Sequence, residues 1–302
     1  MTTATPPATG RASYLWPLAV ANLLANIAIV VTGGAVRLTS SGLGCPTWPR
    51  CDEDSYTAHP ALGFHGVIEF GNRMLTWVLV AIAVACFVAA LRSGDRRARN
   101  LSIGIALGIP AQAILGGITV LTDLNPYVVA LHFLVSMAII GICVVLVDHL
   151  RGPARVAAPP AVRGLAWALL VVGWVVLWLG TVVTGSGPHS GDLDSERTGL
   201  DPQVVSHVHA ASVYLLVALT LAALVLLRGS GHPVLRSVRL LLLVEVLQGV
   251  LGFVQYVNDL PELLVGLHML GAALTSAGLA RVVLTAHRRN RTDAAGVPAA
   301  AL

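Results

Sequence analysis

Residues 65–73, HGVIEFGNR, carry four polar side chains at the head of a long apolar run. His65, Glu69 and Asn72 stand at spacings of i, i+4 and i+7, which place them on one face if the segment is helical, and Arg73 follows directly. An imidazole can ligate a metal, and a carboxyl group in apolar surroundings can take part in proton transfer. Ionisable side chains inside a membrane segment are costly and usually functional. The pattern therefore predicts a reaction site on this face.

Histidines occupy a comparable place in three other apolar runs. Each of four alternate runs begins near a proline, and a histidine follows five to seven residues later. The prolines are Pro60, Pro126, Pro202 and Pro261, and the histidines are His65, His132, His209 and His268. At about 1.5 Å per residue, these side chains lie roughly 8–10 Å from the start of the helices. A single buried histidine is most often a hydrogen-bonded core residue, but four at one depth indicate a functional set.

Paired histidines on facing helices of a dry bundle are typical of bis-imidazole ligation of heme iron. A zinc or copper site is the alternative, but zinc needs further Cys, His or carboxylate ligands nearby. His209 and His268 have no carboxylate at their depth, which favours a plain heme site. His207 lies about 200° around the helix from His209, so we expect it to face the mouth of the site or another helix.

The elements that must hold these residues are membrane helices. The chain is 56% hydrophobic and 11% charged, with a mean hydropathy of +0.78, whereas a soluble domain carries about twice that charged fraction. Runs of about twenty apolar residues can cross a bilayer core, and helices satisfy their backbone there. We predict an all-α polytopic membrane protein. Its eight spans are expected at about residues 15–36, 61–91, 100–122, 127–150, 163–184, 203–227, 235–257 and 262–286.

The arginines predict the orientation of these helices. All 19 basic residues are arginine, and they gather in every second loop and near the termini, whereas the opposite loops are mainly acidic. The arginines in question are Arg92, Arg96, Arg97, Arg99, Arg151, Arg155, Arg163, Arg228, Arg236 and Arg239, with Arg11, Arg288, Arg289 and Arg291 near the ends. By the positive-inside rule both termini are cytoplasmic, and the histidines lie toward the extracytoplasmic side. The net charge of +4 is thus a topology signal, and we expect no nucleic-acid partner.

The cysteines agree with that orientation. Cys45 and Cys51, in GLGCPTWPRC, fall in the first outward loop, where an oxidising compartment permits a disulfide. The five intervening residues, two of them proline, allow a small ring. Cys86 and Cys143 lie inside apolar runs and are expected to be ordinary buried residues.

The chain contains an internal repeat. A constant shift of 136 matches Gln112 to Gln248, Gly116 to Gly252, Asp123 to Asp259 and His132 to His268, and a weaker match joins TGGAVRLTSSG to GTVVTGSGPHSG. Both copies begin on the same side of the membrane, so the repeats are parallel. We predict two four-helix bundles, 15–150 and 163–286, joined by a linker, 151–162. The terminal segments 1–14 and 287–302 are expected to be disordered. For the repeated glutamines we expect helix packing and one interhelical hydrogen bond, without function.

The two halves differ at one ligand. A shift of 137 places Asn72 where the second half has His209, and asparagine is a poor iron ligand. Glu69 stands on the same face, so the first half is predicted to be the reactive one and the second to hold a fixed cofactor. His65, nearly two turns further out, is the alternative to Asn72 as the group that approaches the iron.

These residues resemble a known family. GGAVRLTSSGLGCPTWPRC after the first span, the IEFGNR segment, ALHF in the fourth span and the second histidine pair resemble the heme A synthase family, over about residues 15–286. The resemblance implies a multi-pass protein of the bacterial cell membrane with an eight-span duplicated plan. It implies oxidation of the C8 methyl group of heme O to a formyl group, through successive hydroxylations, to give heme A for cytochrome oxidase.

The resemblance also implies roles for single residues. His209 and His268 correspond to the ligands of a heme b cofactor. His132 corresponds to a ligand of the substrate heme, Glu69 to the essential carboxylate, and Cys45 with Cys51 to a cysteine pair. The implied partners are heme O, heme O synthase (protoheme farnesyltransferase), an electron acceptor or donor, membrane lipid and a second copy of the chain.

Two departures from the family pattern matter. The family usually has Glu-x-x-His-Arg in the second span, whereas residues 69–73 read Glu-Phe-Gly-Asn-Arg. Either His65 or Asn72 must therefore take the place of that histidine. Some members also carry a second cysteine pair in the third outward loop, and HSGDLDSERTG has none.

Other interpretations of the polar residues stay open. Arg37 and Arg73 can pair with heme propionates, because the guanidinium fork suits a carboxylate; for Arg37 a snorkelling residue at the membrane interface is the alternative. Glu69 is expected to act as acid or base, or else to be a structural partner of Arg73 or a neighbouring span. Asp148 and Glu245 receive no functional account.

Two other functions compete with the enzyme. A bis-histidine b-type cytochrome that carries electrons across the membrane needs hemes at different depths, whereas these ligands share one level. A transporter more often shows inverted repeats or interrupted helices.

Overall fold

The computed structural model describes residues 14–152 and 155–287, and all regular elements in these ranges are helices. They are α1 (Leu15–Leu38), α2 (Gly63–Ser93), α3 (Arg96–Leu121), α4 (Pro126–Arg151), α5 (Pro160–Ser186), α6 (Pro202–Leu226), α7 (Val234–Val257) and α8 (Glu262–Ala286), with a 3₁₀ turn, η1 (Pro60–Leu62), before α2. All eight α-helices are long and apolar enough to cross a membrane. This confirms the predicted fold class.

Some sequence-based expectations fall on residues outside these ranges. They are the disorder expected at both ends, the terminal arginines Arg11, Arg288, Arg289 and Arg291, and part of the predicted linker. Which side of the membrane each end of the helices faces stays a prediction.

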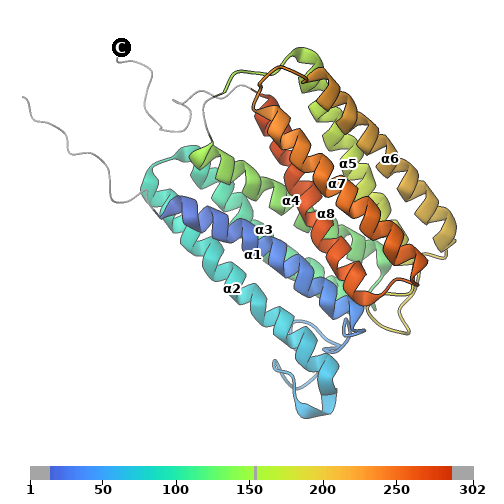
Figure 1. Cartoon of the computed structure of the whole chain (residues 1–302). Helices are drawn as coiled ribbons and strands as arrows, with labels where there is room; N and C mark the ends of the chain where they lie inside the picture. Colours follow the sequence, from blue (N-terminus) through green and yellow to red (C-terminus); the bar gives the residue numbers. More distant parts are fainter. Residues whose placement is uncertain (1–13, 153–154, 288–302) are drawn as a thin grey trace, which may run out of the picture.

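The helices form two four-helix rings that lie side by side (Figure 1). In the N-terminal bundle α1 packs on α2, α2 on α3, α3 on α4, and α4 back on α1; α5 to α8 close in the same order. Within the described residues, α2 does not contact α4, and α6 does not contact α8, so these pairs stand at opposite corners of their rings. The rings meet where α1 and α4 pack on α8, and α4 packs on α5.

The two ends of the molecule differ in what they carry. We call the end with loops 39–62, 122–125, 187–201 and 258–261 the disulfide end, and the end with segments 94–95, 152–159 and 227–233 the linker end. Each even-numbered helix starts at the disulfide end. The expected prolines stand there, as the first residue of η1, α4 and α6 and as the residue before α8. A proline at a helix start costs no hydrogen bond, because that amide has no partner within the helix.

The short turns α3–α4 and α7–α8 have the same backbone. Asp123 and Leu124 have φ values of 50° and 59°, and Asp259 and Leu260 have 59° and 57°. In each turn the leucine amide donates to the carbonyl five residues earlier, at 2.8 Å. Left-handed φ values are uncommon for residues other than glycine and are unfavourable for leucine. Their recurrence at the shift of 136 supports the predicted duplication.

Both bundles combine apolar clusters with a few buried polar side chains, among them Glu245, which accepts a hydrogen bond from Thr220 at 2.9 Å. The C-terminal bundle encloses a large apolar cluster that includes Leu169, Val238 and Leu279. In the N-terminal bundle Asn26 is buried and donates to the side chain of Asn22 at 3.0 Å. The cysteines Cys86 and Cys143 are free and buried, as predicted.

A buried ion-pair cluster joins the two bundles at the linker end. Asp148, at the end of α4, is 5% exposed and accepts hydrogen bonds from Arg155 at 2.8 and 3.2 Å and from Arg281 of α8. Arg155 also donates to the carbonyl of Leu284, and the amide of Ala158 donates to the carbonyl of Ala286. Asp148 therefore ties the connection between the bundles to the last helix.

Replacing Asp148 by asparagine should destabilise the contact between the bundles. Removing one member of a buried ion pair leaves the other charges uncompensated and costs about 3–5 kcal/mol. We expect the apparent unfolding temperature of Asp148→Asn in detergent to fall by about 5–10 °C relative to the parent protein. Asp194→Asn, at an exposed residue of the disulfide end, is the control and should leave the temperature unchanged. Equal unfolding temperatures for both variants would show that the cluster does not join the bundles.

Candidate functional site

Four side chains in the even-numbered helices each lie against a glycine of the preceding helix. A methyl group added at the glycine would lie 3.3–3.4 Å from Cε1 of each histidine and 3.8 Å from Nδ2 of the asparagine. The pairs are Asn72 with Gly33, His132 with Gly116, His209 with Gly180, and His268 with Gly252. At the three histidines such a methyl group would require the ring to move by a few tenths of an ångström, whereas at Asn72 it would make an ordinary contact. The four pairs thus define one register that is shared by both bundles.

The ring nitrogens of this set are unusual for buried polar atoms. Nδ1 of each of the three histidines and Oδ1 of Asn72 are buried without a hydrogen-bond partner in the described part of the chain. Buried polar groups are nearly always satisfied. A site that keeps three imidazoles in this state fits the binding of a further group.

Glutamines anchor the backbone of two of these histidines. Gln112 Nε2 donates to the carbonyl of His132, and Gln248 Nε2 donates to the carbonyl of His268, both at 2.9 Å. The interhelical hydrogen bond expected for these residues is therefore present in both bundles. It holds α4 and α8 at a fixed height relative to α3 and α7.

His65 does not belong to the glycine register. Its Nδ1 lies 2.9 Å from Oγ of Ser41, in the loop after α1, and its backbone carbonyl faces Gly44. Asn72 instead occupies the position equivalent to the three histidines. The geometry therefore favours Asn72 as the residue of α2 that faces the N-terminal site.

The C-terminal bundle offers two imidazoles from opposite corners. His209 of α6 and His268 of α8 are close enough to interact electrostatically. Within residues 14–152 and 155–287, no three His, Cys, Asp or Glu side chains gather as a metal site would require. The zinc alternative, which needs such additional ligands, gains no support, whereas two facing imidazoles fit a heme iron. The ring of His207 lies beside Tyr256 of α7, as expected for a residue that faces another helix.

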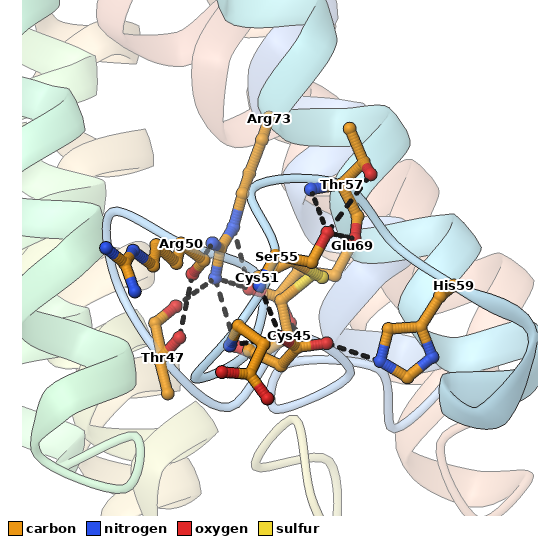
Figure 2. The surroundings of a disulfide bond; sticks show 11 residues. Cys45, Thr47, Arg50, Cys51, Ser55, Thr57, His59, Glu69 and Arg73 are labelled. Carbon is orange, nitrogen blue, oxygen red and sulfur yellow. Dashed lines mark hydrogen bonds and ion pairs between the residues drawn. A yellow bond between two sulfur atoms is a disulfide. The ribbon is translucent and has the colours of Figure 1, made fainter.

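Glu69 is held on both carboxylate oxygens (Figure 2). The amide of Cys45 donates to Oε2 at 2.6 Å, and Arg73 donates to Oε1 at 2.6 Å from Nη2 and 3.2 Å from Nε. Glu69 is only 6% exposed. The ion pair with Arg73 and the bond from the amide of Cys45 give both carboxylate oxygens a hydrogen-bond partner. Glu69 therefore connects α2 to the disulfide loop, residues 41–57.

Arg73 gathers the carbonyls of this loop. It donates to the carbonyls of Cys45, Thr47 and Arg50, each at 3.0 Å, in addition to Glu69. The predicted disulfide between Cys45 and Cys51 is present. Both terminal nitrogens of Arg73 donate to loop carbonyls, and Nε donates to Glu69 of α2, so Arg73 acts here as a clamp between the loop and the helix.

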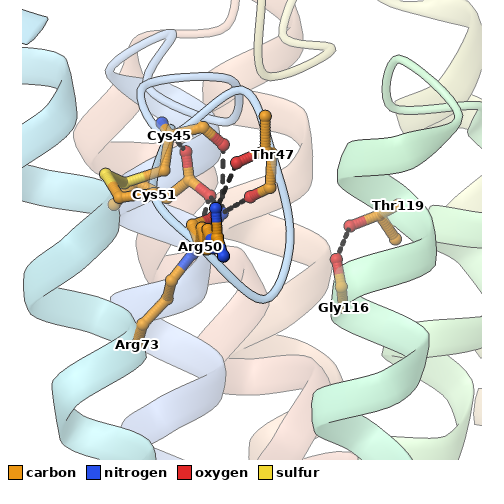
Figure 3. Close-up of polar contacts among 8 residues, drawn as sticks. Cys45, Thr47, Arg50, Cys51, Arg73, Gly116 and Thr119 are labelled. Atoms are coloured by element: carbon orange, nitrogen blue, oxygen red, sulfur yellow. Dashed lines mark hydrogen bonds and ion pairs between the residues drawn. A yellow bond between two sulfur atoms is a disulfide. The ribbon is translucent and has the colours of Figure 1, made fainter. Parts of the chain in front are cut away.

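The disulfide loop reaches across the N-terminal bundle to α3 (Figure 3). The indole of Trp48 lies so close to Gly117 that a methyl group there would be 2.4 Å from Cδ2. Gly117 is adjacent to Gly116, the glycine against which the ring of His132 packs. The loop is therefore attached to both α2 and α3 and approaches α3 next to the glycine that contacts His132.

Asp52 stabilises the far side of the same loop. Its carboxylate accepts the amides of Asp54 at 2.8 Å and Ser55 at 2.7 Å and pairs with His59. The amide of Asp54, followed by that of Ser55 and the charge of His59, holds the pKa of Asp52 below its usual value.

Arg37 points away from the N-terminal site. It extends from the end of α1 to the other bundle and donates to the carbonyls of His189 and Thr184, the latter at 3.0 Å. Thr184 lies one turn beyond Gly180, the glycine against which the ring of His209 packs. Arg37, expected beside the substrate heme, is thus placed over the C-terminal bundle.

Sequence reasoning missed two parts of this site. Gly116 and Gly252 recur at the shift of 136, and that recurrence, combined with the histidine spacing, was a usable signal for the glycine register. Gly33 and Gly180 stood in the weaker half of the repeat. Nothing in the sequence indicated that Trp48 packs on Gly117.

Comparisons with known proteins match both halves of the chain. The family model COX15-CtaA, described as cytochrome oxidase assembly protein, matches residues 17–188. A heme A synthase of Symbiobacterium thermophilum is 29% identical over 183 residues, which cover 56% of this chain and 59% of that protein. A heme A synthase of a Bradyrhizobium species (strain ORS 278) is 27% identical over an alignment that covers 100% of this chain and 98% of that protein. A heme A synthase of Halalkalibacterium halodurans is 25% identical over 80% of this chain and 84% of that protein.

Loss of the Arg73 clamp should expose the disulfide. Arg73→Gln removes the ion pair to Glu69 and most hydrogen bonds to the loop carbonyls, so the loop detaches more often from α2. We expect reduction of the Cys45–Cys51 bond by a water-soluble phosphine, followed by thiol labelling, to become about tenfold faster, as for loss of one or two charged hydrogen bonds. Arg92→Gln, at an exposed residue near the linker end of α2, should not change the rate. An unchanged rate in Arg73→Gln would rule out the clamp.

Proposed function

This chain belongs to the COX15-CtaA family of cytochrome oxidase assembly proteins, and we therefore propose that it is a heme A synthase. In this proposal it oxidises the C8 methyl group of heme O to a formyl group through successive hydroxylations. Heme A synthase relatives that align along most of the chain support the assignment. The structural observation that carries it is the register of Asn72, His132, His209 and His268, each against a glycine.

We propose that the C-terminal bundle, 163–286, holds a resident heme b between His209 and His268. The two imidazoles stand on helices that do not contact each other, and glycines leave room for each ring. Such a heme would supply one-electron redox chemistry when bound. Gln248 fixes the height of His268, so the ligand geometry is prepared before the cofactor binds.

The N-terminal bundle, 15–150, is proposed to receive heme O. His132 is in the same relation to Gly116 as His268 to Gly252, which supports it as a ligand of the substrate iron. The opposite position is held by Asn72, and an amide is a far weaker ligand than an imidazole. This difference suits the two roles, because a substrate must leave after it has reacted, whereas a cofactor stays.

Glu69 is proposed to serve as the acid or base beside the substrate methyl group. It lies on α2 at i−3 from Asn72, which places both on one face. Arg73 orients this carboxylate and holds the disulfide loop over the site, and we propose this positioning role for it in place of propionate binding. With Trp48 on Gly117, the loop shields the N-terminal site from water on that side.

The setting of the reaction follows from the same assignment. We propose a multi-pass protein of the bacterial cell membrane, with both heme sites toward the extracytoplasmic side, as the arginine distribution predicts. Heme O is the substrate, and heme O synthase and an electron acceptor or donor are the proposed partners, with a homo-oligomer as the proposed assembly. A bis-histidine cytochrome is not favoured, because the N-terminal bundle has a single histidine in the glycine register.

The decisive test is co-expression of the protein with a heme O synthase, followed by chromatography of the extracted hemes. We expect heme A from the parent protein. Glu69→Gln should stop heme A formation while the resident heme spectrum persists, because the variant lacks a titratable group but keeps hydrogen-bonding atoms. Glu53→Gln, in the exposed part of the same loop, is the matched control. Only heme O and heme B from the parent protein would refute the function, and a normal yield from Glu69→Gln would refute its role.

The glycine register predicts a sharp contrast between two alanine variants of α7. Gly252→Ala places a methyl group 3.3 Å from the His268 ring, whereas Gly249→Ala meets nothing within 4 Å. Crowding the ring displaces the ligand, so we expect Gly252→Ala to retain several-fold less heme b per protein than Gly249→Ala. Equal heme contents, measured by the pyridine hemochrome spectrum, would contradict the register.

A second contrast separates Asn72 from His65. Asn72→His should add an imidazole opposite His132, so that the substrate heme becomes bis-histidine ligated and dissociates more slowly, by about tenfold or more. His65→Ala should leave substrate affinity unchanged, because His65 is bonded to Ser41 outside the register. Loss of heme O binding in His65→Ala, measured by absorbance titration, would make His65 the ligand instead.

A further inference from the structure

Two arginines from different bundles meet above the C-terminal bundle at the disulfide end. Arg37, from α1, donates to the carbonyls of Thr184 and His189, and Arg197 donates to the carbonyl of Pro188 at 2.9 Å. Because the accepting carbonyls belong to neighbouring residues, the two guanidinium groups are neighbours as well. They are close enough for their charges to repel each other.

Among the described residues, neither arginine of this pair forms an ion pair with a carboxylate. The ion pairs found in residues 14–152 and 155–287 include neither Arg37 nor Arg197. Nη1 of Arg197 is buried without a hydrogen-bond partner among these residues, and so is the hydroxyl of Ser195 in the same loop. Two like charges and two unsatisfied donors in one place are unfavourable unless an anion completes the arrangement.

The loop that carries the pair is fixed over the bundle from several sides. His189 donates through Nε2 to the carbonyl of Leu260, in the α7–α8 turn, at 2.7 Å. The amide of Gly42 donates to the carbonyl of Gly191 at 2.8 Å, which ties the same loop to the N-terminal bundle. The position of the pair is therefore set by contacts with both bundles.

The pair also has a defined height above the candidate heme site. Thr184, whose carbonyl accepts a hydrogen bond from Arg37, lies one helical turn beyond Gly180. The ring of His209 packs against Gly180. One turn corresponds to about 5.4 Å along the helix. The two arginines therefore stand about one helical turn from the level of the His209 ring, toward the disulfide end, where a negatively charged substituent of a group held by His209 and His268 would meet them.

We infer that Arg37 and Arg197 form a carboxylate-binding pocket for a propionate of the porphyrin held by His209 and His268. The inference rests on the proposed function. It assigns Arg197 to the cofactor site and moves Arg37 to that site from the substrate heme. Both bundles then contribute residues to the cofactor site, because Arg37 belongs to α1 of the N-terminal bundle. A guanidinium suits this task because its planar donors match a carboxylate.

The test uses the full-length protein, freed of heme and titrated with hemin or with hemin dimethyl ester, whose propionates are neutral. Binding is followed by the Soret band. A His132→Ala background, used throughout, confines the titration to the C-terminal site. We expect the background protein to bind hemin about tenfold more tightly than the ester, as for loss of one charged hydrogen-bonding pair. Arg197→Gln and Arg37→Gln should each lose most of this preference while still binding the ester normally.

Arg228→Gln removes the same charge at an exposed residue of the linker end and should keep the full preference. Equal binding of hemin and its ester by the background protein would overturn the inference and leave the heme site intact. Binding of neither compound would overturn the proposed function as well. If hemin and ester bind alike and Arg197→Gln loses a co-purifying anionic phospholipid, the pocket belongs to a lipid phosphate and the inference fails.

Discussion

The close contact between a ring and a bare helix backbone is the constraint on which this structure depends. Inside a membrane bundle an imidazole needs space, a fixed height and freedom from competing hydrogen bonds. A glycine on the neighbouring helix gives the space, and a glutamine one turn away fixes the height in two of the four cases. Small residues at helix contacts are common in membranes because they let backbones approach. Here the same device accompanies ring Nδ1 atoms that are buried without a hydrogen-bond partner among the described residues.

The two bundles use this device for different ends. The C-terminal bundle has a histidine at both positions that pack against glycines, His209 and His268, and an apolar cluster in its core. The N-terminal bundle has one imidazole opposite an asparagine, and Glu69, Arg73 and the disulfide loop are joined by hydrogen bonds at its disulfide end. The two bundles thus share one frame. The differences between them are concentrated at one ligand position and in one loop.

The positions of the eight helices were predicted well from the sequence, whereas the side-chain contacts at the disulfide end were predicted poorly. Hydropathy and proline positions located all eight helices to within a few residues, because chain length and apolar runs dictate membrane spans directly. The shift of 136 predicted the glutamine contacts, and the structure adds that the α3–α4 and α7–α8 turns match at the same shift, because repeated residues repeat their local geometry.

The directions of long side chains were not predictable in the same way. Arg37 and Arg73 were both expected at a porphyrin edge in the N-terminal half, yet one crosses to the other bundle and the other clamps a loop. His65 matched the other histidines when residues were counted from the prolines, but η1 and the long start of α2 set it outside their register. Loop conformation decides such contacts, and it depends on tertiary packing that hydrophobic periodicity does not encode.

The reach of Arg37 has a consequence for how the protein is made. Its carbonyl partners are 147 and 152 residues further along the chain. During synthesis, α1 to α4 enter the membrane before those carbonyls have been translated, so the guanidinium has to wait in water or among lipid headgroups. The N-terminal bundle therefore reaches its final form at the disulfide end only after α5 and the loop that follows it have been synthesised and inserted. The first half is thus translated before the second, but its contacts through Arg37 form only when the second half is in place.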